Sequence, residues 1–297
     1  MTKNIVYATD ENYWIPLYNS IYSLLENNRS INANIYIICN EKNEMFDENI
    51  DYLHDVHGGI NINYITINDD LFADYPEPRH LTKGIYYRIL LGTLLPEDIN
   101  KVLYIDCDTL IVSSIGDLMN KELEGAMIGA VPHLELISPF EGLSIDNLWY
   151  NTGVMLINLE KWRECEIEEK CLEYIEENHN MRLPLQKILN EIIHEEGFWK
   201  TFHPKYNMMQ EWIEKYDESD HELDPKIVHF TGGNKPWYYR TVRPFKQDWW
   251  DYLSKTPYHD YQPKDYNWKI IIVHHIDKKL KQYPALRDMI KPIYQYF

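Results

Sequence analysis

The chain of 297 residues has the length of one large α/β domain or of a domain with an appendage, and its 44% hydrophobic residues are ample for a folded core. Its formal net charge of -18 argues against nonspecific nucleic-acid binding, which needs clustered Lys and Arg against the phosphates. No apolar run is long enough to span a bilayer and no signal peptide precedes the first strand-like pattern, so we expect a cytoplasmic protein.

Strand and helix patterns alternate through the first half of the chain. Strands are predicted at residues 5–9, 35–39, 60–67 and directly before Asp106, and helices at residues 16–25, 44–56 and 85–91. This alternation predicts parallel β-α-β units, hence an α/β domain with a mixed, mostly parallel central sheet. Ligands gather beyond the carboxyl ends of such strands, which is where Asp10 and Asp106 lie.

The second half is less regular. Strands are predicted at residues 126–131, 153–159 and 227–230, and helices at residues 161–177 and 185–193. From about residue 245 aromatic residues crowd together, and residues 261–297 carry seven Lys or Arg against three Asp. We therefore divide the chain into a main α/β domain, residues 1–245, and an aromatic and basic helical extension, residues 246–297. Two interpretations of the extension stay open, a peripheral membrane contact or a helical pair packed on the core.

One predicted strand ends in two closely spaced acids. The segment from Val102 to Ile111 reads VLYIDCDTLI, so an apolar run leads directly into Asp106 and Asp108. Two carboxylates this close repel each other unless a positive charge lies between them. Mg²⁺ and Mn²⁺ take oxygen ligands from carboxylates and phosphates, so the pair predicts metal and phosphate chemistry. Taken alone the D-x-D pattern is weak, and its alternative is a solvated turn.

The same five letters, DCDTL, match the first motif of the haloacid-dehalogenase-like phosphotransferases, D-x-D-x-T-[LV]. There the first acid, Asp106, would be the nucleophile and Asp108 a general acid. That chemistry also needs a second acidic pair after another apolar strand, whereas Asp217 and Asp220 lie in a polar stretch. A phosphatase is therefore a remote alternative.

Six motifs in a fixed order resemble glycosyltransferase family 8, the retaining family that includes glycogenin and bacterial lipopolysaccharide galactosyl- and glucosyltransferases. The resemblance covers roughly residues 4–240. Its motifs are NIVYATDENY from Asn4, YYR ending at Arg88, the D-x-D segment, YNTGVMLINL from Tyr150, QKILN from Gln186 and HFTGGNKPW from His229. The resemblance implies a Rossmann-like, nucleotide-sugar-binding domain of the GT-A type that uses a UDP-sugar and a divalent cation.

The resemblance also implies roles for single residues. Asp106, Asp108 and His229 would hold the cation, and the imidazole favours Mn²⁺ over Mg²⁺. Arg88 would contact the donor sugar or diphosphate. The complete set of expected donor-binding residues is Ala8, Asp10, Asn12, Arg88, Asp106, Cys107, Asn151, Gln186, Gly232 and Lys235.

Several of these residues keep a structural alternative. Asp10 is also a plausible helix N-cap, Arg88 a structural ion-pair partner, and a single His after a strand is more often structural. Gly232 permits close backbone approach and Lys235 supplies charge to phosphate, which is why they favour a site near His229. The acceptor side has two weak candidates, His80 and His133, each with the alternative of a loop histidine.

The reaction mechanism that we expect depends on Gln186. The resemblance places it beneath the anomeric carbon, opposite the leaving group, and an amide is a poor nucleophile. We therefore expect Gln186 and Arg88 to be catalytic in a front-face, ion-pair-like substitution rather than a double displacement. The family's usual D-Q-D is Leu185-Gln186-Lys187 here, so a sugar-binding acid is missing.

The function expected from the sequence is transfer of a hexose, galactose or glucose, from a UDP-sugar to a hydroxyl of a glycan, glycolipid or glycoprotein acceptor. Because of Leu185 and Lys187, a degenerate family member that binds nucleotide sugar or glycan without efficient transfer is the non-enzymatic alternative.

Overall fold

A computed structural model describes residues 2–72, 75, 83–133, 149–178, 185–195, 199–218, 224–268, 270–271 and 276. The chain divides into two compact units, Met1–His229 and Phe230–Phe297, and each is described by itself. His80 lies outside the described residues. The domain boundary expected at residue 245 stays a prediction.

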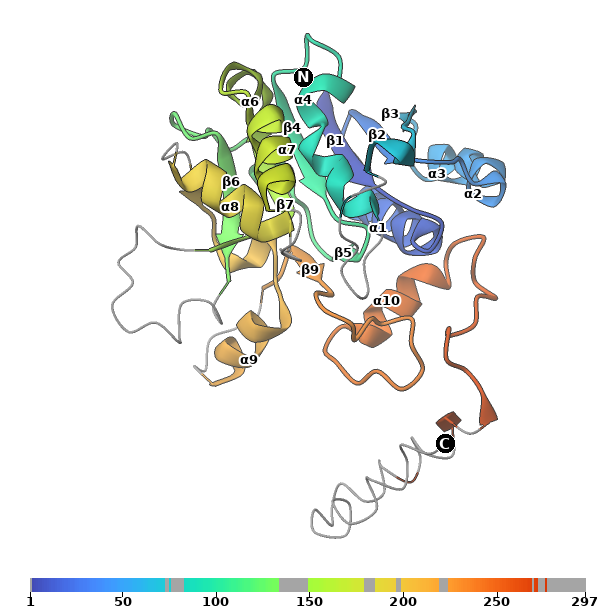
Figure 1. Cartoon of the computed structure of the whole chain (residues 1–297). Helices are drawn as coiled ribbons and strands as arrows, with labels where there is room; N and C mark the ends of the chain where they lie inside the picture. The colour runs from blue at the N-terminus through green and yellow to red at the C-terminus, as the bar shows by residue number, and fades with distance from the viewer. Residues whose placement is uncertain are drawn as a thin grey trace. The chain divides into compact units, whose positions relative to one another are not determined.

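The first unit is built on a seven-stranded sheet (Figure 1). In spatial order its strands are β3 (Ile60–Thr66), β2 (Ala33–Cys39), β1 (Lys3–Ala8), β4 (Lys101–Ile105), β7 (Tyr150–Asn158), β6 (Ile128–Pro132) and β8 (Trp199–Thr201). The strands from β3 to β4 are mutually parallel, β7 is antiparallel to both β4 and β6, and β8 is parallel to β6. The expectation of a mixed, mostly parallel sheet is confirmed.

A second, smaller sheet lies beside the first in the same unit. It pairs β5 (Thr109–Ile111) with β9 (Ile227–His229) in antiparallel register, and Thr109 lies opposite His229. Because β5 begins three residues after Asp106 and β9 ends at His229, this pairing brings distant segments of the chain to the carboxyl end of β4.

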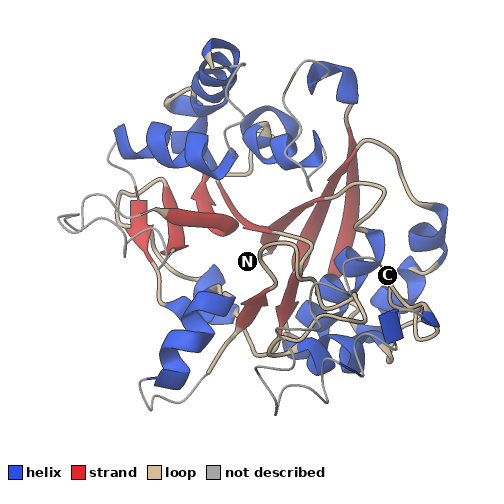
Figure 2. Cartoon of the chain, turned by 60° about the horizontal axis from the view of Figure 1, so that its bottom comes forward, coloured by secondary structure: helices blue, strands red, loops and turns tan. Residues whose placement is uncertain are grey.

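Helices cover both faces of the large sheet (Figure 2). The described helices of this unit are α1 (Trp14–Asn27), α2 (Glu44–Glu48), α3 (Ile50–Val56), α4 (Leu91–Leu94), α5 (Gly116–Met119), α6 (Leu159–Glu164), α7 (Ile167–Glu177), α8 (Leu185–Glu195) and α9 (Gln210–Glu218), with 3-10 turns η1 (Asp69–Phe72), η2 (Lys83–Ile89) and η4 (Pro204–Tyr206).

Strand alternation sorts the core onto the two faces. Val6, Tyr104 and Met155 are neighbours across three strands and belong to the cluster that packs against η2, α6, α7 and α8. On the opposite face Tyr7 meets α1, where its hydroxyl lies 3.4 Å from the hydroxyl of Ser20. The sheet is therefore buried on both sides, as parallel strands require.

The structure corrects two of the predicted helices. The helix expected at residues 44–56 is two helices, because the chain breaks at Asn49 between α2 and α3. The helix expected at residues 161–177 is also two, since Glu166 adopts a left-handed conformation (φ 51°) between α6 and α7. The pattern at residues 85–91 is mainly the 3-10 turn η2. The predicted strands and the helix at residue 185 are confirmed.

The second unit contains α10 (Lys246–Leu253) and a cluster of aromatic rings. Trp249 is fully buried and packs within 5.5 Å of Trp237 and 5.0 Å of Trp250, measured between ring centroids. The Lys246 ammonium donates to three backbone carbonyls of residues 238–241 and fastens that turn to the helix. Among the described residues, no helix combines the length and apolar character needed to cross a bilayer.

Candidate metal centre at the end of the central sheet

The site lies where β4 ends and β7 begins. These strands are antiparallel, so the carboxyl end of β4 and the amino end of β7 share one edge of the sheet. The backbone N–H of Asp106 donates to the carbonyl of Gly153 at 2.7 Å and continues the ladder one residue beyond the strand. β1 is parallel to β4 and delivers Ala8 and Asp10 to the same edge.

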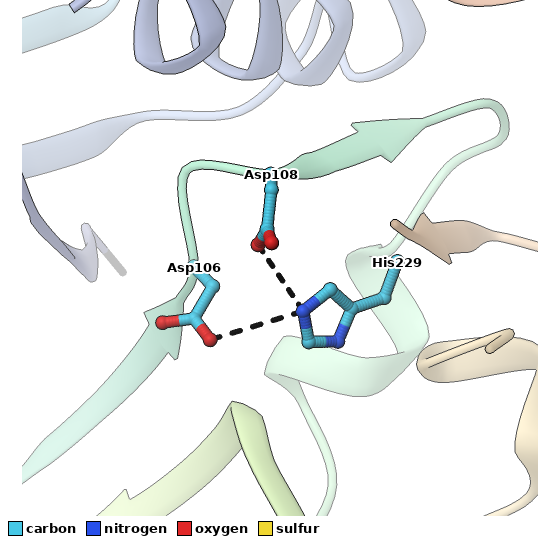
Figure 3. Close-up of side chains that lie close together, drawn as sticks. All are labelled: Asp106, Asp108 and His229. Carbon is cyan, nitrogen blue, oxygen red and sulfur yellow. Dashed lines mark ion pairs between the residues drawn. The ribbon is translucent and has the colours of Figure 1, made fainter. Parts of the chain in front are cut away.

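Three side chains converge here from two segments, the turn between β4 and β5 and the end of β9 (Figure 3). Nε2 of His229 lies 3.1 Å from Oδ1 of Asp108 and 3.8 Å from Oδ2 of Asp106. The three candidate ligand atoms all lie within 4.8 Å of one another. Between the two acids, the Cys107 thiol donates to the carbonyl of Ala8 at 3.0 Å and ties this turn to the end of β1.

The histidine is oriented for ligation. Its Nδ1 lies 2.9 Å from Oδ1 of Asn207, a fully buried amide oxygen that can only accept a hydrogen bond. The hydrogen therefore belongs on Nδ1, and the Nε2 lone pair is available for a cation on the side of the acids. Two carboxylates and one imidazole match the donor set of Mn²⁺ and similar divalent ions, so these residues fit the expected metal.

Arg88 neutralises part of the acidic charge. Its guanidinium contacts Asp106 at 2.8 and 3.3 Å and donates to the carbonyl of Thr152 at 3.0 Å. Burial opposes the charge on Arg88, but the carboxylate of Asp106 outweighs burial and raises the pKa of Arg88 above its ordinary value. The Tyr104 hydroxyl donates to the same carboxylate at 2.8 Å, and burial raises the pKa of Tyr104, so the phenol stays protonated.

A pocket opens beside these groups. Its lining is Ala8, Thr9, Asp10, Tyr13, Gly84, Ile85, Arg88, Asp106, Cys107 and Asp108. Six of the residues predicted to bind donor or metal thus share one cavity. Asp10 is held by an Asx turn, in which its carboxylate accepts the backbone N–H of Asn12 at 2.7 Å. Asn12 itself is exposed and is not part of the lining.

Asn151 and Gln186 meet at the start of β7. The amide nitrogen of Asn151 donates to Oε1 of Gln186 at 3.3 Å, and Oδ1 of Asn151 accepts the backbone N–H of Gly153 at 2.9 Å. Gln186 is the second residue of α8, and its carbonyl accepts a hydrogen bond from the fully buried Asn190. Asn151 thereby links Gln186 to Gly153, whose carbonyl accepts the backbone N–H of Asp106.

The two departures from the family pattern have structural partners. Leu185 is 4% exposed and belongs to the large hydrophobic cluster. Lys187 forms an ion pair with Glu191 one turn along α8, at 3.4 Å.

The remaining predicted residues are placed as follows. His133 follows β6 and contacts Glu211 and Asn151, each at 3.1 Å. Gly232 and Lys235 belong to the second unit, where Gly232 has a positive φ of 74° and the buried Lys235 ammonium donates to the carbonyl of Phe230 at 2.8 Å. The acceptor role of His133 and the donor roles of Gly232 and Lys235 stay predictions.

Three residues of the site were missed by sequence reasoning. A Cβ added to Gly153 would lie 2.2 Å from Cε1 of His229 and 2.6 Å from Oδ2 of Asp106, so only glycine leaves room for the ligands. A glycine inside a predicted strand is a signal of such close approach and was available. Asn207 and Glu211 carry no comparable local signal, because they meet the site only through tertiary contacts.

The fold and the site define an α/β protein of the GT-A type with an acid-x-acid motif and a histidine at the sheet edge. The chain belongs to glycosyl transferase family 8, whose model matches residues 4–241. In the phosphatase alternative Asp106 would attack as a nucleophile, whereas here Arg88 and Tyr104 engage its carboxylate.

Two bacterial proteins are similar in sequence, and a solved galactosyltransferase is similar in fold. General stress protein A of Bacillus subtilis (strain 168) is 27% identical over 278 residues, covering 85% of this chain and 93% of that protein. Lipopolysaccharide 1,2-glucosyltransferase of Escherichia coli (strain K12) is 26% identical over 278 residues, covering 88% and 80%. The galactosyltransferase LgtC, solved with donor and acceptor sugar analogues, shares the fold with a TM-score of 0.76 at 24% identity, covering 86% and 96%.

Proposed function

We propose that the chain is a metal-dependent, retaining glycosyltransferase that moves a hexose from a UDP-sugar to a hydroxyl of a glycan, glycolipid or glycoprotein. The observation that carries the proposal is the convergence of Asp106, Asp108 and His229, with the His229 Nδ1 engaged by Asn207. The name of the Escherichia coli relative supports glucose, and that of LgtC supports galactose.

The residues of the site have different proposed roles, which follow from their side-chain chemistry. Asp106, Asp108 and His229 would hold Mn²⁺ or Mg²⁺, which supplies electrostatic stabilisation for the charge that grows on the departing UDP. Asp10 and the backbone near Ala8 would receive the uridine, since they line the pocket beside the acids. Arg88 forms an ion pair with Asp106 and lines the same pocket, where its charge would contact the donor sugar or diphosphate.

Gln186 supports a retaining mechanism that has no carboxylate nucleophile. Its Oε1 already accepts a hydrogen bond from Asn151, so the amide is held in place, and an amide is a weak nucleophile. We therefore propose front-face substitution, in which the acceptor enters on the side of the leaving phosphate and a UDP oxygen takes the acceptor proton.

The test is a panel of UDP-sugars, with thermal unfolding and sugar transfer measured in Mn²⁺ with and without a chelator. A ligand at a hundred times its Kd should stabilise the fold by about 2.7 kcal/mol. We expect UDP to raise the melting temperature only while metal is present. No shift with UDP, or a shift that the chelator leaves unchanged, contradicts the metal-bridged donor site.

A binding protein without efficient transfer is the second candidate, and it is favoured by the buried Leu185 and the paired Lys187. Neither residue replaces the family's sugar-binding acids. A metal-dependent shift with UDP but no transfer from any sugar would favour this candidate. Replacing Leu185 and Lys187 by Asp should then change the donor preference or restore transfer.

We also propose a cytoplasmic location with peripheral membrane contact through the C-terminal extension. Supporting features are the exposed Trp268 and Tyr266, with 66% and 52% of their surfaces accessible, and the excess of Lys and Arg in residues 261–297. Liposome flotation of the full chain and of a chain ending at residue 260 tests this. Equal flotation of the two contradicts it.

A further inference from the structure

A chain of hydrogen bonds leads away from the candidate metal centre. From His229 it continues through Asn207, whose Nδ2 donates to Oδ1 of Asn151 at 2.8 Å. Nδ2 of Asn151 lies 3.1 Å from Nε2 of His133, and Nδ1 of His133 lies 3.1 Å from Oε1 of Glu211. We call these five residues, from Glu211 to His229, the relay.

Two groups determine which atom of each hydrogen bond in the relay is the donor and which is the acceptor. Glu211 is a carboxylate that accepts from the His133 ring, so Nδ1 of His133 carries the hydrogen and Nε2 is an acceptor. The backbone N–H of Gly153 can only donate, and it points at Oδ1 of Asn151, so the Asn151 nitrogen must face His133. Both groups impose the same order of donors and acceptors.

This order decides what His229 presents to the acids. In this order Nδ1 of His229 donates to Oδ1 of Asn207, 2.9 Å away. In the opposite direction Asn207 would donate to Nδ1, the hydrogen would move to Nε2, and the lone pair needed for a metal would be lost. The direction is therefore a condition for metal binding, and it is set by groups that do not touch the metal position.

The relay also branches to the proposed reaction site. The same Asn151 nitrogen that meets His133 donates to Oε1 of Gln186 at 3.3 Å. Glu211 itself lies near the start of α9, and the neighbouring Trp212 anchors that helix by donating to the carbonyl of Pro132, the residue before His133. The Glu211 and His133 side chains are only 11% and 16% exposed, so their contact is screened little by solvent.

We infer that Glu211, His133 and Asn207 are positioning residues that fix the His229 tautomer and the Asn151 and Gln186 amides. The inference rests on the proposed function for the role of His229 as a metal ligand. Partners that orient a ligating histidine are commonly worth 10- to 100-fold in metal affinity. For the remote Glu211 we expect an effect at the lower end of this range.

The first experiment measures Mn²⁺ affinity of the full chain by electron paramagnetic resonance of the free ion. Glu211→Ala should weaken binding about 10-fold, and Glu211→Gln should recover most of the loss because its amide oxygen still accepts from His133. The matched control is Glu214→Ala, which removes the same charge from an exposed position on the same helix. Equal effects of Glu211→Ala and Glu214→Ala, or no effect of either, overturn the inference.

The second experiment needs no metal. Nitrogen-15 NMR of the metal-free chain should find a hydrogen on Nδ1 of both His133 and His229, and none on Nε2 of His133. A hydrogen on Nε2 of His133 overturns the relay even if Mn²⁺ binds and transfer proceeds. Conversely, the expected tautomers in a chain that fails to bind Mn²⁺ would leave the relay order intact and contradict the proposed function.

Discussion

Gly153 is the residue to which the metal ligands are most sensitive. It lies opposite the end of β4, and its missing side chain is the space that the His229 ring and the Asp106 carboxylate occupy. A methyl group there would overlap the histidine ring at 2.2 Å, well inside van der Waals contact. Because β4 and β7 are central strands of the sheet, the backbone cannot move aside, so the ligands must.

Gly153→Ala should therefore abolish Mn²⁺ binding and sugar transfer while the chain remains folded. The measurements are metal titration, transfer activity and circular dichroism. Gly58→Ala is the matched control, because a Cβ at Gly58 meets nothing within 4 Å. Retention of wild-type metal affinity in Gly153→Ala would contradict the role given to this glycine.

At the same scale, the acids were predictable and their supporting residues were not. Asp106 and Asp108 follow an apolar run, which is a local pattern, and the six motifs gave His229 by resemblance. Asn207 lies in a turn after η4 and reaches His229 only because β9 runs past it, where the N–H of His229 donates to the carbonyl of Met208. Contacts of this kind depend on the complete fold and leave no periodicity in the sequence.

Among the elements, α6 holds the connection that leads into β4. The guanidinium of Arg163 donates to five backbone carbonyls, one in α4 and four between α4 and β4, those of Gly92, Leu95, Pro96, Glu97 and Ile99. A planar group with five N–H donors can satisfy this set, whereas an ammonium on a flexible stem cannot. This connection enters β4, the strand that ends one residue before Asp106.

Arg163→Lys should lower the free energy of unfolding by about 2 kcal/mol, since hydrogen bonds from charged groups contribute about 1.5 to 3 kcal/mol each and Lys keeps some of them. Urea denaturation measures the change. The control is Arg29→Lys, because the Arg29 side chain is 71% exposed and its pair with Glu26 should contribute less than about 0.5 kcal/mol. Equal changes in the free energy of unfolding of the two variants would contradict a stabilising role for the Arg163 hydrogen bonds.

Asp117 on α5 gives a pH-dependent prediction. Burial favours its neutral form, but hydrogen bonds from Lys226 and Tyr206 outweigh burial and lower the pKa from 3.8 to about 2. A carboxyl with a lowered folded-state pKa stabilises the fold above its unfolded pKa, and this contribution disappears as the pH falls through the folded pKa. The stabilisation should therefore be complete above about pH 4 and fade toward pH 2.

The test compares the melting temperature of wild type and Asp117→Asn between pH 2 and pH 6. We expect wild type to be more stable at pH 5 and the difference to shrink as the pH approaches 2. Asp55→Asn, at an exposed position of α3, is the control for loss of one negative charge. A difference in melting temperature that stays constant with pH, or that grows in acid, would contradict the lowered pKa of Asp117.

Helices and strands could be predicted from the sequence where they are long or have a clear hydrophobic pattern. Strands with long apolar runs, such as β2 and β7, were found, while β5 and β8 have only three residues each and show no detectable period. α9 was missed because its sequence is mostly polar and starts after a segment without helix signals. The long helices predicted around Asn49 and Glu166 are interrupted there, and only Asn49 carries a residue type that favours a helix end.

For the first unit as a whole, the candidate metal centre joins the two sheets. Asp106 follows a strand of the seven-stranded sheet, whereas Asp108 directly precedes β5 and His229 ends β9 in the two-stranded sheet. A cation held by all three would therefore tie the small sheet to the large one. A ligand that binds only the folded arrangement stabilises that arrangement by mass action.

Mn²⁺ should accordingly slow amide hydrogen exchange in β5 and β9, because these short strands open locally more easily than the central strands. Exchange measured with and without Mn²⁺ tests this. In Asp108→Asn the same addition should leave the exchange of both strands nearly unchanged. Identical exchange of the wild-type strands in both conditions would contradict a metal that joins the sheets.

The pairing of β5 with β9 has a consequence for affinity. Residues 108 and 229 are more than a hundred positions apart, and closing a loop of that size in a flexible chain costs about 4 to 5 kcal/mol of entropy. The pairing of β5 with β9 closes this loop when the chain folds, so the entropic cost does not oppose ion binding. The Kd for the ion is then lower by roughly a thousandfold than it would be if binding itself had to close the loop. The three residue pairs between β5 and β9 therefore hold Asp108 and His229 close together before the ion binds, which raises the affinity of a site with only three protein ligands.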